Sequence, residues 1–360
     1  MKAAICYKYG EALVIEDVNL DPPKQNEVKV RIVVASICHS DIHIIRGERT
    51  GSVPVLAGHE ASGIVENVGP NVTLVRVGDR VVVSLLRSCG YCYYCSSGAP
   101  HKCEAHWLLD DENRVNTKNG EPIRLGLRTG AFAEYVIVHE SQLVKIPNDI
   151  PFDHAAVLAC GVITGYGAVV NTANVKPGES VVVIGTGGVG LNSIQAASIS
   201  GASPIIAVDI LDNKLQAAKQ FGATHTINTA NQDTVKIVGE LTLGHGVDYV
   251  FVGVGSTSAV SQALKLVRKR GSVIIAGIPK TGETMPLIVD ELVGRELRVI
   301  GSSMGGTRLR TDIPKLIDLY KHGWIKLEEL IQNKYPIEQI NEAIKDMENG
   351  NAIKNVIVFE

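Results

Sequence analysis

The stretch VVVIGTGGVGLNSIQAA, residues 181–197, joins an apolar β-type run to a helical pattern through a turn rich in glycine. Gly185, Gly187 and Gly190 follow the spacing G-x-G-x-x-G, which lets the backbone turn tightly and approach a pyrophosphate at the start of the helix. Asp209 ends the next apolar run, where an acid hydrogen-bonds both ribose hydroxyls and repels a 2′-phosphate. The pattern predicts a dinucleotide site that prefers NAD over NADP; the alternative is a glycine turn that only packs a helix on a sheet.

The same alternation of strand and helix fills the C-terminal half of the chain. Apolar runs at 180–185, 204–209, 247–253, 272–277 and 297–301 alternate with helical patterns at 189–201, 213–222 and 258–271. This alternation predicts a doubly wound parallel sheet in an α/β fold.

The N-terminal part differs, because short β-like runs are separated there by Gly, Pro and Asp turn signals. These runs lie at 27–36, 61–69, 80–86 and 132–138, and the chain closes with two amphipathic helical patterns at 311–325 and 337–350 and an apolar run at 354–360. A length of 360 residues exceeds the usual size of one core, so we expect two domains.

Composition narrows the class of protein. Hydrophobic residues make up 45% and charged residues 20%, which is typical of globular proteins. The net charge of −3 offers no field that would attract nucleic acid or an anionic membrane. The sequence shows no signal peptide and no apolar run long enough to span a membrane, so we expect a cytoplasmic protein with reduced thiols.

Four of the seven cysteines lie close together, at Cys89, Cys92, Cys95 and Cys103. The spacing C-x2-C-x2-C-x7-C can direct four thiolates at one zinc ion, which accepts them tetrahedrally. An iron–sulfur signature would have three residues before its fourth cysteine and a proline after it, whereas here the gap is seven and Glu104 follows. Disulfides or unlinked thiols remain the alternative. A zinc ion with four protein ligands has no open position, so this one would be structural.

Three cysteines are left over. Cys38, His59 and Cys160 form the ligand set of a catalytic zinc that keeps a fourth position open. Glu60 follows His59 directly. Cys6 fits a small buried thiol near the first strand.

Several of these motifs together resemble the zinc-containing medium-chain alcohol dehydrogenases. They are GHEASGIVENVG at 58–69, the four-cysteine segment, CGVITGYGA at 160–168 and GTGGVG at 185–190. The resemblance implies a GroES-like β-barrel catalytic domain at 1–160, to which residues 301–360 return, and a Rossmann NAD-binding domain at 161–300. It also implies two zinc ions per chain, one catalytic and one structural.

The resemblance assigns roles to individual residues. It implies that Cys38, His59 and Cys160 bind the catalytic zinc, that Glu60 approaches this zinc transiently, and that Asp41 orients the ligand histidine. Ser40 and His43 match the family's proton relay, which passes through the nicotinamide ribose. The coenzyme contacts that it implies or that the glycine turn predicts are His39, Thr164, Gly185, Gly187, Gly188, Val189, Gly190, Asp209, Lys214, Ile278 and Lys354.

The implied reaction is NAD-linked oxidation of a primary alcohol to an aldehyde, or its reverse, by hydride transfer from a zinc alkoxide. Ser40 replaces a bulkier threonine and Leu85 replaces an aromatic ring, which favours medium-chain, bulky or aromatic substrates. The alternative within this class is a glutathione-linked formaldehyde dehydrogenase, which has an acid where this chain has Arg49. A zinc-ribbon module for nucleic acid and a crystallin-like relative without zinc fit the sequence less well.

The sequence also bears on assembly. The long segment at 106–130 resembles dimeric members of the family, and we expect a homodimer, with a homotetramer as the alternative. Residues 284–302 could extend the sheet into a second copy; the alternative is an ordinary buried helix and strand.

Overall fold

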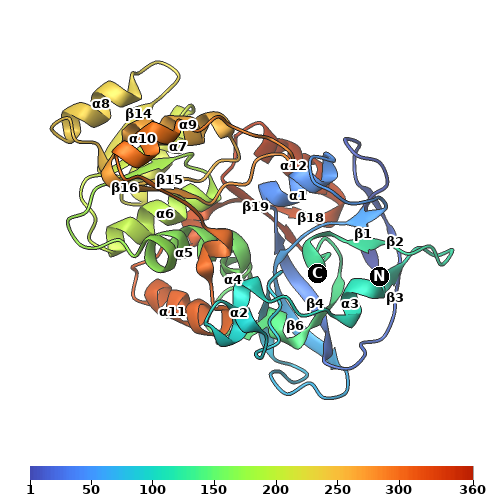
Figure 1. Ribbon diagram of the computed structural model, residues 1–360. Coiled ribbons are helices and arrows are strands. Elements are labelled where there is room, and N and C mark those ends of the chain that lie inside the picture. Colours follow the sequence, from blue (N-terminus) through green and yellow to red (C-terminus); the bar gives the residue numbers. More distant parts are fainter. Residues whose placement is uncertain (360) are drawn as a thin grey trace. The chain divides into compact units, whose positions relative to one another are not determined.

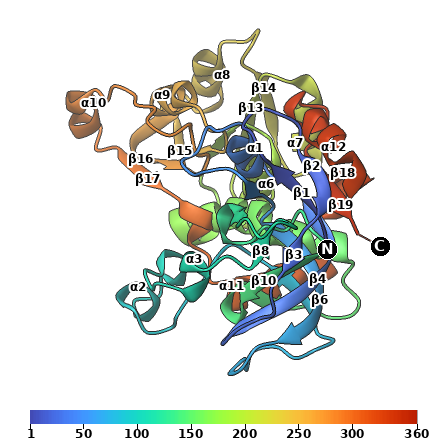
Figure 2. The same ribbon diagram turned by 90° about the vertical axis from the view of Figure 1, so that its right-hand side faces the viewer.

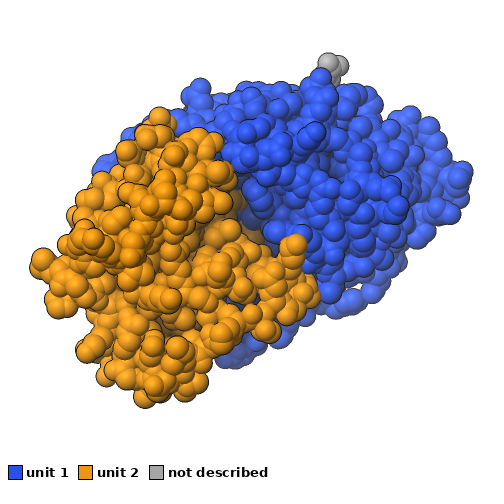
Figure 3. All heavy atoms as spheres, turned by 90° about the horizontal axis from the view of Figure 1, so that it is seen from above, with its two compact units in different colours: residues 1–160, 308–360 blue, residues 161–307 orange. Residues whose placement is uncertain are grey.

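The computed structural model describes residues 1–359, which form two compact units. Unit 1 consists of Met1–Cys160 and Arg308–Glu360, and unit 2 of Gly161–Thr307 (Figure 3). The chain thus returns to unit 1 at Arg308, where we had placed the return at residue 301.

Unit 2 is built on one six-stranded sheet whose neighbouring strands are all parallel (Figure 1 and Figure 2). Its strand order is β14 (His225–Asn228), β13 (Ile205–Asp209), β12 (Val181–Ile184), β15 (Val247–Val252), β16 (Val267–Ile275) and β17 (Arg298–Gly301). Its helices include α6 (Gly188–Ile199), α7 (Asp212–Gln220), α8 (Thr234–Leu241), α9 (Thr257–Leu266) and α10 (Val289–Gly294). The strand order runs outward in both directions from β12, so the sheet is doubly wound, as predicted.

Two details of this sheet differ from the prediction. The helix expected at 258–271 ends at Leu266, because Val267 has an extended backbone (φ −78°, ψ 139°) and begins β16 opposite Val247. The edge strand β14 and helix α8 were not predicted. β14 has the sequence HTIN and buries only one large apolar side chain, Ile227, so its pattern is too weak to read as a strand.

Unit 1 contains two larger sheets that share one hydrophobic core. The seven-stranded sheet has the order β11 (Leu143–Lys145), β7 (Arg80–Val83), β6 (Glu60–Val68), β4 (Glu27–Ser36), β19 (Lys354–Val358) and β18 (Ile331–Pro336), with β10 (Tyr135–His139) also paired to β4. The four-stranded sheet has the order β2 (Val14–Asp17), β1 (Lys2–Cys6), β5 (Val55–Leu56) and β9 (Arg124–Leu125). The predicted strand at 27–36 matches β4 at both ends.

The C-terminal segment joins this sheet directly. Helices α11 (Leu309–Lys321) and α12 (Ile340–Glu348) precede β19, which pairs antiparallel with β4 so that Val356 faces Ser36. The backbone N–H of Ile37 donates to the carbonyl of Asn355 at 3.0 Å. This register brings the start of β19 next to the segment that leads into Cys38.

The helical run Phe152–Ala173 carries Cys160. It consists of α4 (Phe152–Val157), a π-helical turn (Leu158–Val162), α5 (Ile163–Gly167) and a second π-helical turn (Ala168–Ala173). By length and composition alone it could cross a membrane, but 78% of its apolar window is buried inside the protein, as in the core helix of a globular fold. Cys160 lies in the first π-helical turn, a distortion that is frequent at functional sites.

Candidate functional site

The buried carboxylate of Asp41 connects the first two predicted zinc ligands. Cys38 is the N-cap of α1 (His39–Ile45), and its backbone N–H donates to Asp41 Oδ2 at 3.3 Å. Asp41 Oδ1 accepts from the backbone N–H of Gly58 at 2.9 Å and from His59 Nδ1 at 2.8 Å. One carboxylate therefore holds the start of α1 and the turn before β6 in a fixed relation.

The other ring nitrogen of His59 is a candidate metal ligand. His59 is fully buried, and its Nε2 has no hydrogen-bond partner among the described residues. A buried polar atom without a partner is costly, whereas a metal ion would satisfy it. Burial alone would lower the pKa of His59, but Asp41 and Cys38 raise it well above its usual range, so metal binding would displace a proton.

Two thiols and a second carboxylate face the same space. The ligand atoms of Cys38, His59, Glu60 and Cys160 all lie within 4.8 Å of one another. A hydrogen bond with Cys160 lowers the pKa of Cys38 well below its usual range, while the same contact and burial raise that of Cys160. Two sulfurs and an imidazole are ligands that zinc accepts, so the residues fit the predicted metal.

Glu60 is held by a residue from the far end of the chain. Lys354 Nζ lies 2.5 Å from Glu60 Oε2 and donates to the carbonyl of Ile37 at 3.3 Å. Burial raises the pKa of Glu60 to about 7 against the opposing effect of Lys354. Burial would lower the pKa of Lys354, but Glu60 raises it. Lys354 is only 4% exposed, and its charged partner in the structure is Glu60. Its contact with a coenzyme phosphate stays a prediction.

Ser40 and His43 lie on the outer part of α1. They are three residues apart and therefore adjacent on one face of the helix, while Asp41, Ile44 and Ile45 are buried. The His43 side chain is 28% exposed, and its Nδ1 lies 2.5 Å from a carboxylate oxygen of Glu48. His39, the first residue of α1, also belongs to unit 1. Sequence reasoning did not foresee the partner of His43.

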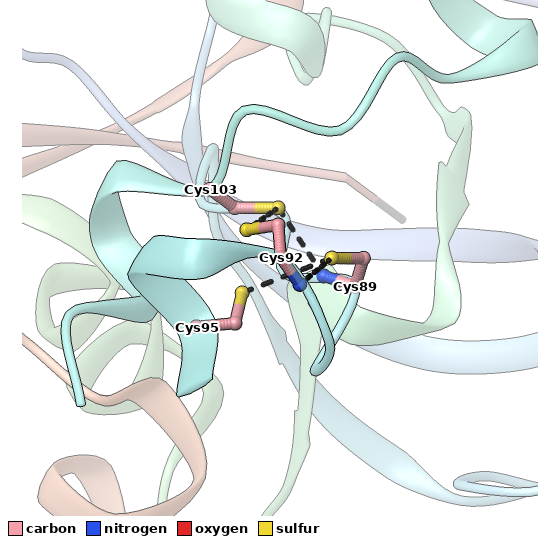
Figure 4. Close-up of side chains that lie close together, drawn as sticks. All are labelled: Cys89, Cys92, Cys95 and Cys103. Carbon is pink, nitrogen blue, oxygen red and sulfur yellow. Dashed lines mark hydrogen bonds between the residues drawn. The ribbon is translucent and has the colours of Figure 1, made fainter. Parts of the chain in front are cut away.

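The four clustered cysteines converge on one centre (Figure 4). The sulfurs of Cys89 and Cys95 are 4.0 Å apart, and those of Cys92 and Cys103 are 3.9 Å apart. A tetrahedron with zinc–sulfur bonds of about 2.3 Å has edges of about 3.8 Å, whereas a disulfide bond is about 2.05 Å long. None of the seven cysteines, each within residues 1–359, takes part in a disulfide bond. The geometry fits a structural zinc and excludes the disulfide alternative.

The protonation of these thiols follows from their local contacts. Backbone N–H groups of Cys95 and Glu104 lower the pKa of Cys92 to about 6, and burial raises that of Cys95 to about 12. A cation at the centre would favour the thiolate form at every ligand.

The glycine turn lies at the carboxyl end of β12. Gly185 has a φ of +85°, which favours glycine, and α6 begins at Gly188 after its N-cap Gly187. A Cβ atom on Gly190 would lie 1.8 Å from the carbonyl oxygen of Gly185, whereas one on Gly187 would meet nothing within 4 Å. Gly190 thus packs the helix against the strand, and Gly187 leaves room for a ligand.

Asp209 holds this turn from the end of the neighbouring strand. Its Oδ2 accepts from the backbone N–H and the hydroxyl of Thr186 at 2.7 and 2.9 Å. Its Oδ1 accepts from the backbone N–H groups of Ile210 and Leu211 at 2.8 and 3.1 Å. Thr186 was missed by sequence reasoning; the signal was a hydroxyl residue inside the turn, facing the acid at the end of the next strand.

The other predicted coenzyme residues of unit 2 lie on separate elements. Val189 is in the first turn of α6, and Lys214 is in the first turn of α7, which follows β13. Thr164 is buried on α5 beside the Met304 sulfur, and Ile278, three residues after β16, is 53% exposed. Their contacts with coenzyme stay predictions.

Comparison with known proteins identifies relatives for both units. Residues 24–148 match the alcohol dehydrogenase GroES-like domain, and residues 188–322 match the zinc-binding dehydrogenase family. The chain is 37% identical to S-(hydroxymethyl)glutathione dehydrogenase of Saccharomyces cerevisiae, covering 99% of this chain and 95% of that protein.

Solved structures show the same likeness. Benzyl alcohol dehydrogenase from Acinetobacter calcoaceticus is 33% identical with a TM-score of 0.92, covering 100% of this chain and 99% of that one. An Escherichia coli CFT073 alcohol dehydrogenase, described as short chain and complexed with NADH, is 26% identical with a TM-score of 0.83, covering 100% and 99%.

Replacing one cysteine of the four-cysteine lobe tests the structural metal. We expect Cys92→Ser to lower the zinc content from two ions to one per chain. It should also lower the free energy of unfolding by up to about 4 kcal/mol, the stabilisation from a ligand at about a thousand times its dissociation constant. Cys6→Ala, at a buried thiol outside both clusters, should keep two zinc ions. Elemental analysis that finds two zinc ions in Cys92→Ser would contradict the assignment.

Two glycine substitutions separate packing from coenzyme binding. Gly190→Ala should lower the free energy of unfolding by about 1–3 kcal/mol, because its methyl group overlaps the Gly185 carbonyl. Gly187→Ala should change it by less than about 1 kcal/mol but weaken NAD binding at least about tenfold, because its methyl group enters the space for the pyrophosphate. Chemical denaturation and calorimetric NAD titration measure the two effects; equal effects of both variants on stability would refute this division.

Proposed function

The chain belongs to the zinc-containing medium-chain alcohol dehydrogenases, and we propose that it oxidises medium-chain, bulky or aromatic primary alcohols to aldehydes with NAD and catalyses the reverse reduction. One observation carries the proposal above the others. The buried His59 ring directs toward two thiols a nitrogen that has no hydrogen-bond partner within residues 1–359, and Ser40 follows the first of these thiols by two residues.

Cys38, His59 and Cys160 would hold the catalytic zinc. When bound, this zinc supplies Lewis-acid chemistry that lowers the pKa of an alcohol hydroxyl. Asp41 keeps the His59 ring turned so that Nε2 faces the two sulfurs. Lys354 holds the Glu60 carboxylate at the side of the same space.

Two side chains of α1 would carry the proton of the alcohol to water. We assign Ser40 Oγ as the group that takes the hydroxyl proton and His43 as the group that passes it to water, because the His43 side chain is partly exposed. The glycine turn, which Asp209 holds through Thr186, would bind NAD, and NAD when bound would supply the hydride chemistry. The same groups serve the reverse reaction.

The substrate class rests on two residues and one relative. Ser40 lacks the methyl group of threonine, and Leu85 stands where a ring is common in the family, so the pocket would admit a larger group. The similarity to a benzyl alcohol dehydrogenase supports an aromatic or bulky substrate. One methylene in an apolar pocket changes binding by only about 1–3 kcal/mol, so we expect a graded preference.

A second candidate is oxidation of the glutathione adduct of formaldehyde. It is favoured by the similarity to the yeast S-(hydroxymethyl)glutathione dehydrogenase. Against it, Arg49 occupies the position where glutathione-linked formaldehyde dehydrogenases have an acid. The neighbouring acid, Glu48, is hydrogen-bonded to His43.

A substrate series tests the proposed function. We expect kcat/KM for hexanol, benzyl alcohol and geraniol to exceed that for ethanol by at least about tenfold with NAD, and NADP to support much less turnover. The measurement uses the zinc-replete protein. An optimum at ethanol would contradict the wide pocket, and formaldehyde oxidation that appears only with glutathione would establish the second candidate.

Ser40→Ala is the matched variant for this series. It should lower turnover of every alcohol by about 100-fold or more, because the hydroxyl proton then has no acceptor in the chain. Zinc content and NAD affinity should remain those of the wild type. Unimpaired turnover would remove Ser40 from the relay.

We also propose a second copy of the chain as partner and the cytoplasm as location. No cysteine within residues 1–359 takes part in a disulfide bond, which supports a reducing compartment. β17 is an edge strand of the unit 2 sheet, and exposed apolar side chains lie on and before it. They are Leu287, Ile288, Val289, Val293 and Val299.

Analytical ultracentrifugation measures the oligomeric state and so tests the proposed dimer. The wild type should sediment as a homodimer, and Val293→Asp should shift it toward the monomer, because a charge would replace an apolar contact. Val77→Asp, at an exposed valine of unit 1, is the control. A monomeric wild type would refute the proposal, and a tetramer would establish the alternative assembly.

A further inference from the structure

Helix α1 ends in a Schellman motif that determines where residue 48 lies. The N–H of Glu48 donates to the carbonyl of His43 at 2.9 Å, and the N–H of Gly47 donates to the carbonyl of Ile44 at 3.0 Å. Gly47 has a φ of +73°, and a Cβ atom there would lie 2.9 Å from the ring of Tyr9. The motif therefore requires glycine at 47 and turns the chain so that residue 48 comes back to residue 43.

The side chains of this motif make an ion pair where an apolar contact is usual. In Schellman motifs the residue after the glycine commonly packs on the residue five positions earlier. Here these residues are Glu48 and His43, and the Nδ1–Oε2 distance is 2.5 Å. The two side chains are 23% and 28% exposed, so the pair is partly shielded from water.

We propose that Glu48 is a positioning residue of the proton relay, which holds the His43 ring in the tautomer that donates from Nδ1 and accepts at Nε2. This inference rests on the proposed function, in which His43 delivers the substrate proton to water. A neutral histidine can accept a proton only at the nitrogen that carries none, and a hydrogen bond at one nitrogen determines the state of the other. A carboxylate accepts and cannot donate, so it fixes Nδ1 as the donor.

The proton balance of the step is simple. The ring gains the substrate proton at Nε2 and becomes a cation next to the Glu48 carboxylate. It then gives one proton to water and returns to the starting tautomer. The carboxylate keeps its charge throughout, and its role is to orient the ring and to stabilise the cation.

The neighbouring cation Arg46 has a partner of its own. Arg46 binds Glu348 through Nε and Nη2 at 2.7 and 2.6 Å, and it also acts electrostatically on Glu48. Glu348 therefore offers a matched control. Glu348→Gln removes one negative charge near the end of the same helix and leaves the His43–Glu48 contact in place.

The first experiment observes the ring nitrogens directly. In holoenzyme labelled with ¹⁵N-histidine, the His43 signals, assigned by their loss in His43→Gln, should show a protonated Nδ1 and an unprotonated Nε2 at alkaline pH. Glu48→Gln should give a mixture of both tautomers, because an amide can donate as well as accept. Glu348→Gln should match the wild type. Unchanged His43 signals in Glu48→Gln would overturn the proposal.

The second experiment separates positioning from folding. Glu48→Gln should lower kcat for the best alcohol about tenfold with KM, zinc content and thermal midpoint unchanged, since general acid–base groups contribute at least this much. In the His43→Gln background the same change should have no further effect. An equal loss in both backgrounds would show that Glu48 acts through the fold instead.

The two proposals fail in different ways. If the wild-type enzyme oxidises no alcohol, the proposed function falls, while the nitrogen signals still report whether Glu48 sets the tautomer. If alcohol oxidation is normal and the Glu48→Gln signals and kcat equal those of the wild type, the positioning role alone falls.

Discussion

The candidate active site depends on one buried carboxylate. Asp41 is fully buried and accepts hydrogen bonds from Cys38, Gly58 and His59, which belong to two segments of unit 1. Truncating one partner of such a network leaves the other groups buried and unpaired, which costs several kcal/mol. The carboxylate also determines which nitrogen of His59 is left for a metal. The same hydrogen bonds of Asp41 thus stabilise the local fold and orient the metal ligand His59.

The charges around the metal-binding space come from distant parts of the sequence. Glu60 and Lys354 are separated by 294 residues and meet because β19 pairs with β4. The buried Glu60 carboxylate would be repelled by a thiolate at Cys38, and the lysine ammonium offsets this repulsion. The return of the C-terminal segment to unit 1 therefore has an electrostatic consequence at the site, in addition to extending the sheet.

Much of this arrangement could be predicted from sequence, because the decisive signals are local. The glycine spacing, the β-like run at 27–36 and the four-cysteine spacing each describe one short segment. The helix prediction was wrong at Val267. Its neighbours continue a helical pattern, but Val267 pairs with Val247 and belongs to a strand. The contact between Lys354 and Glu60 could not be predicted, because the register that brings them together is a property of the folded sheet.

The cap at the end of α1 is only partly predictable from sequence, and it helps to place several functional side chains on one short helix. The motif His43–Gly47–Glu48 is local and readable, yet its meaning depends on knowing that the helix ends at Ile45. In seven residues, α1 turns Asp41 inward to His59 and keeps Ser40 and His43 together on another face. An inserted residue would rotate everything after it by about 100°. The helix must therefore keep its length and both of its ends, because each end fixes a different functional side chain.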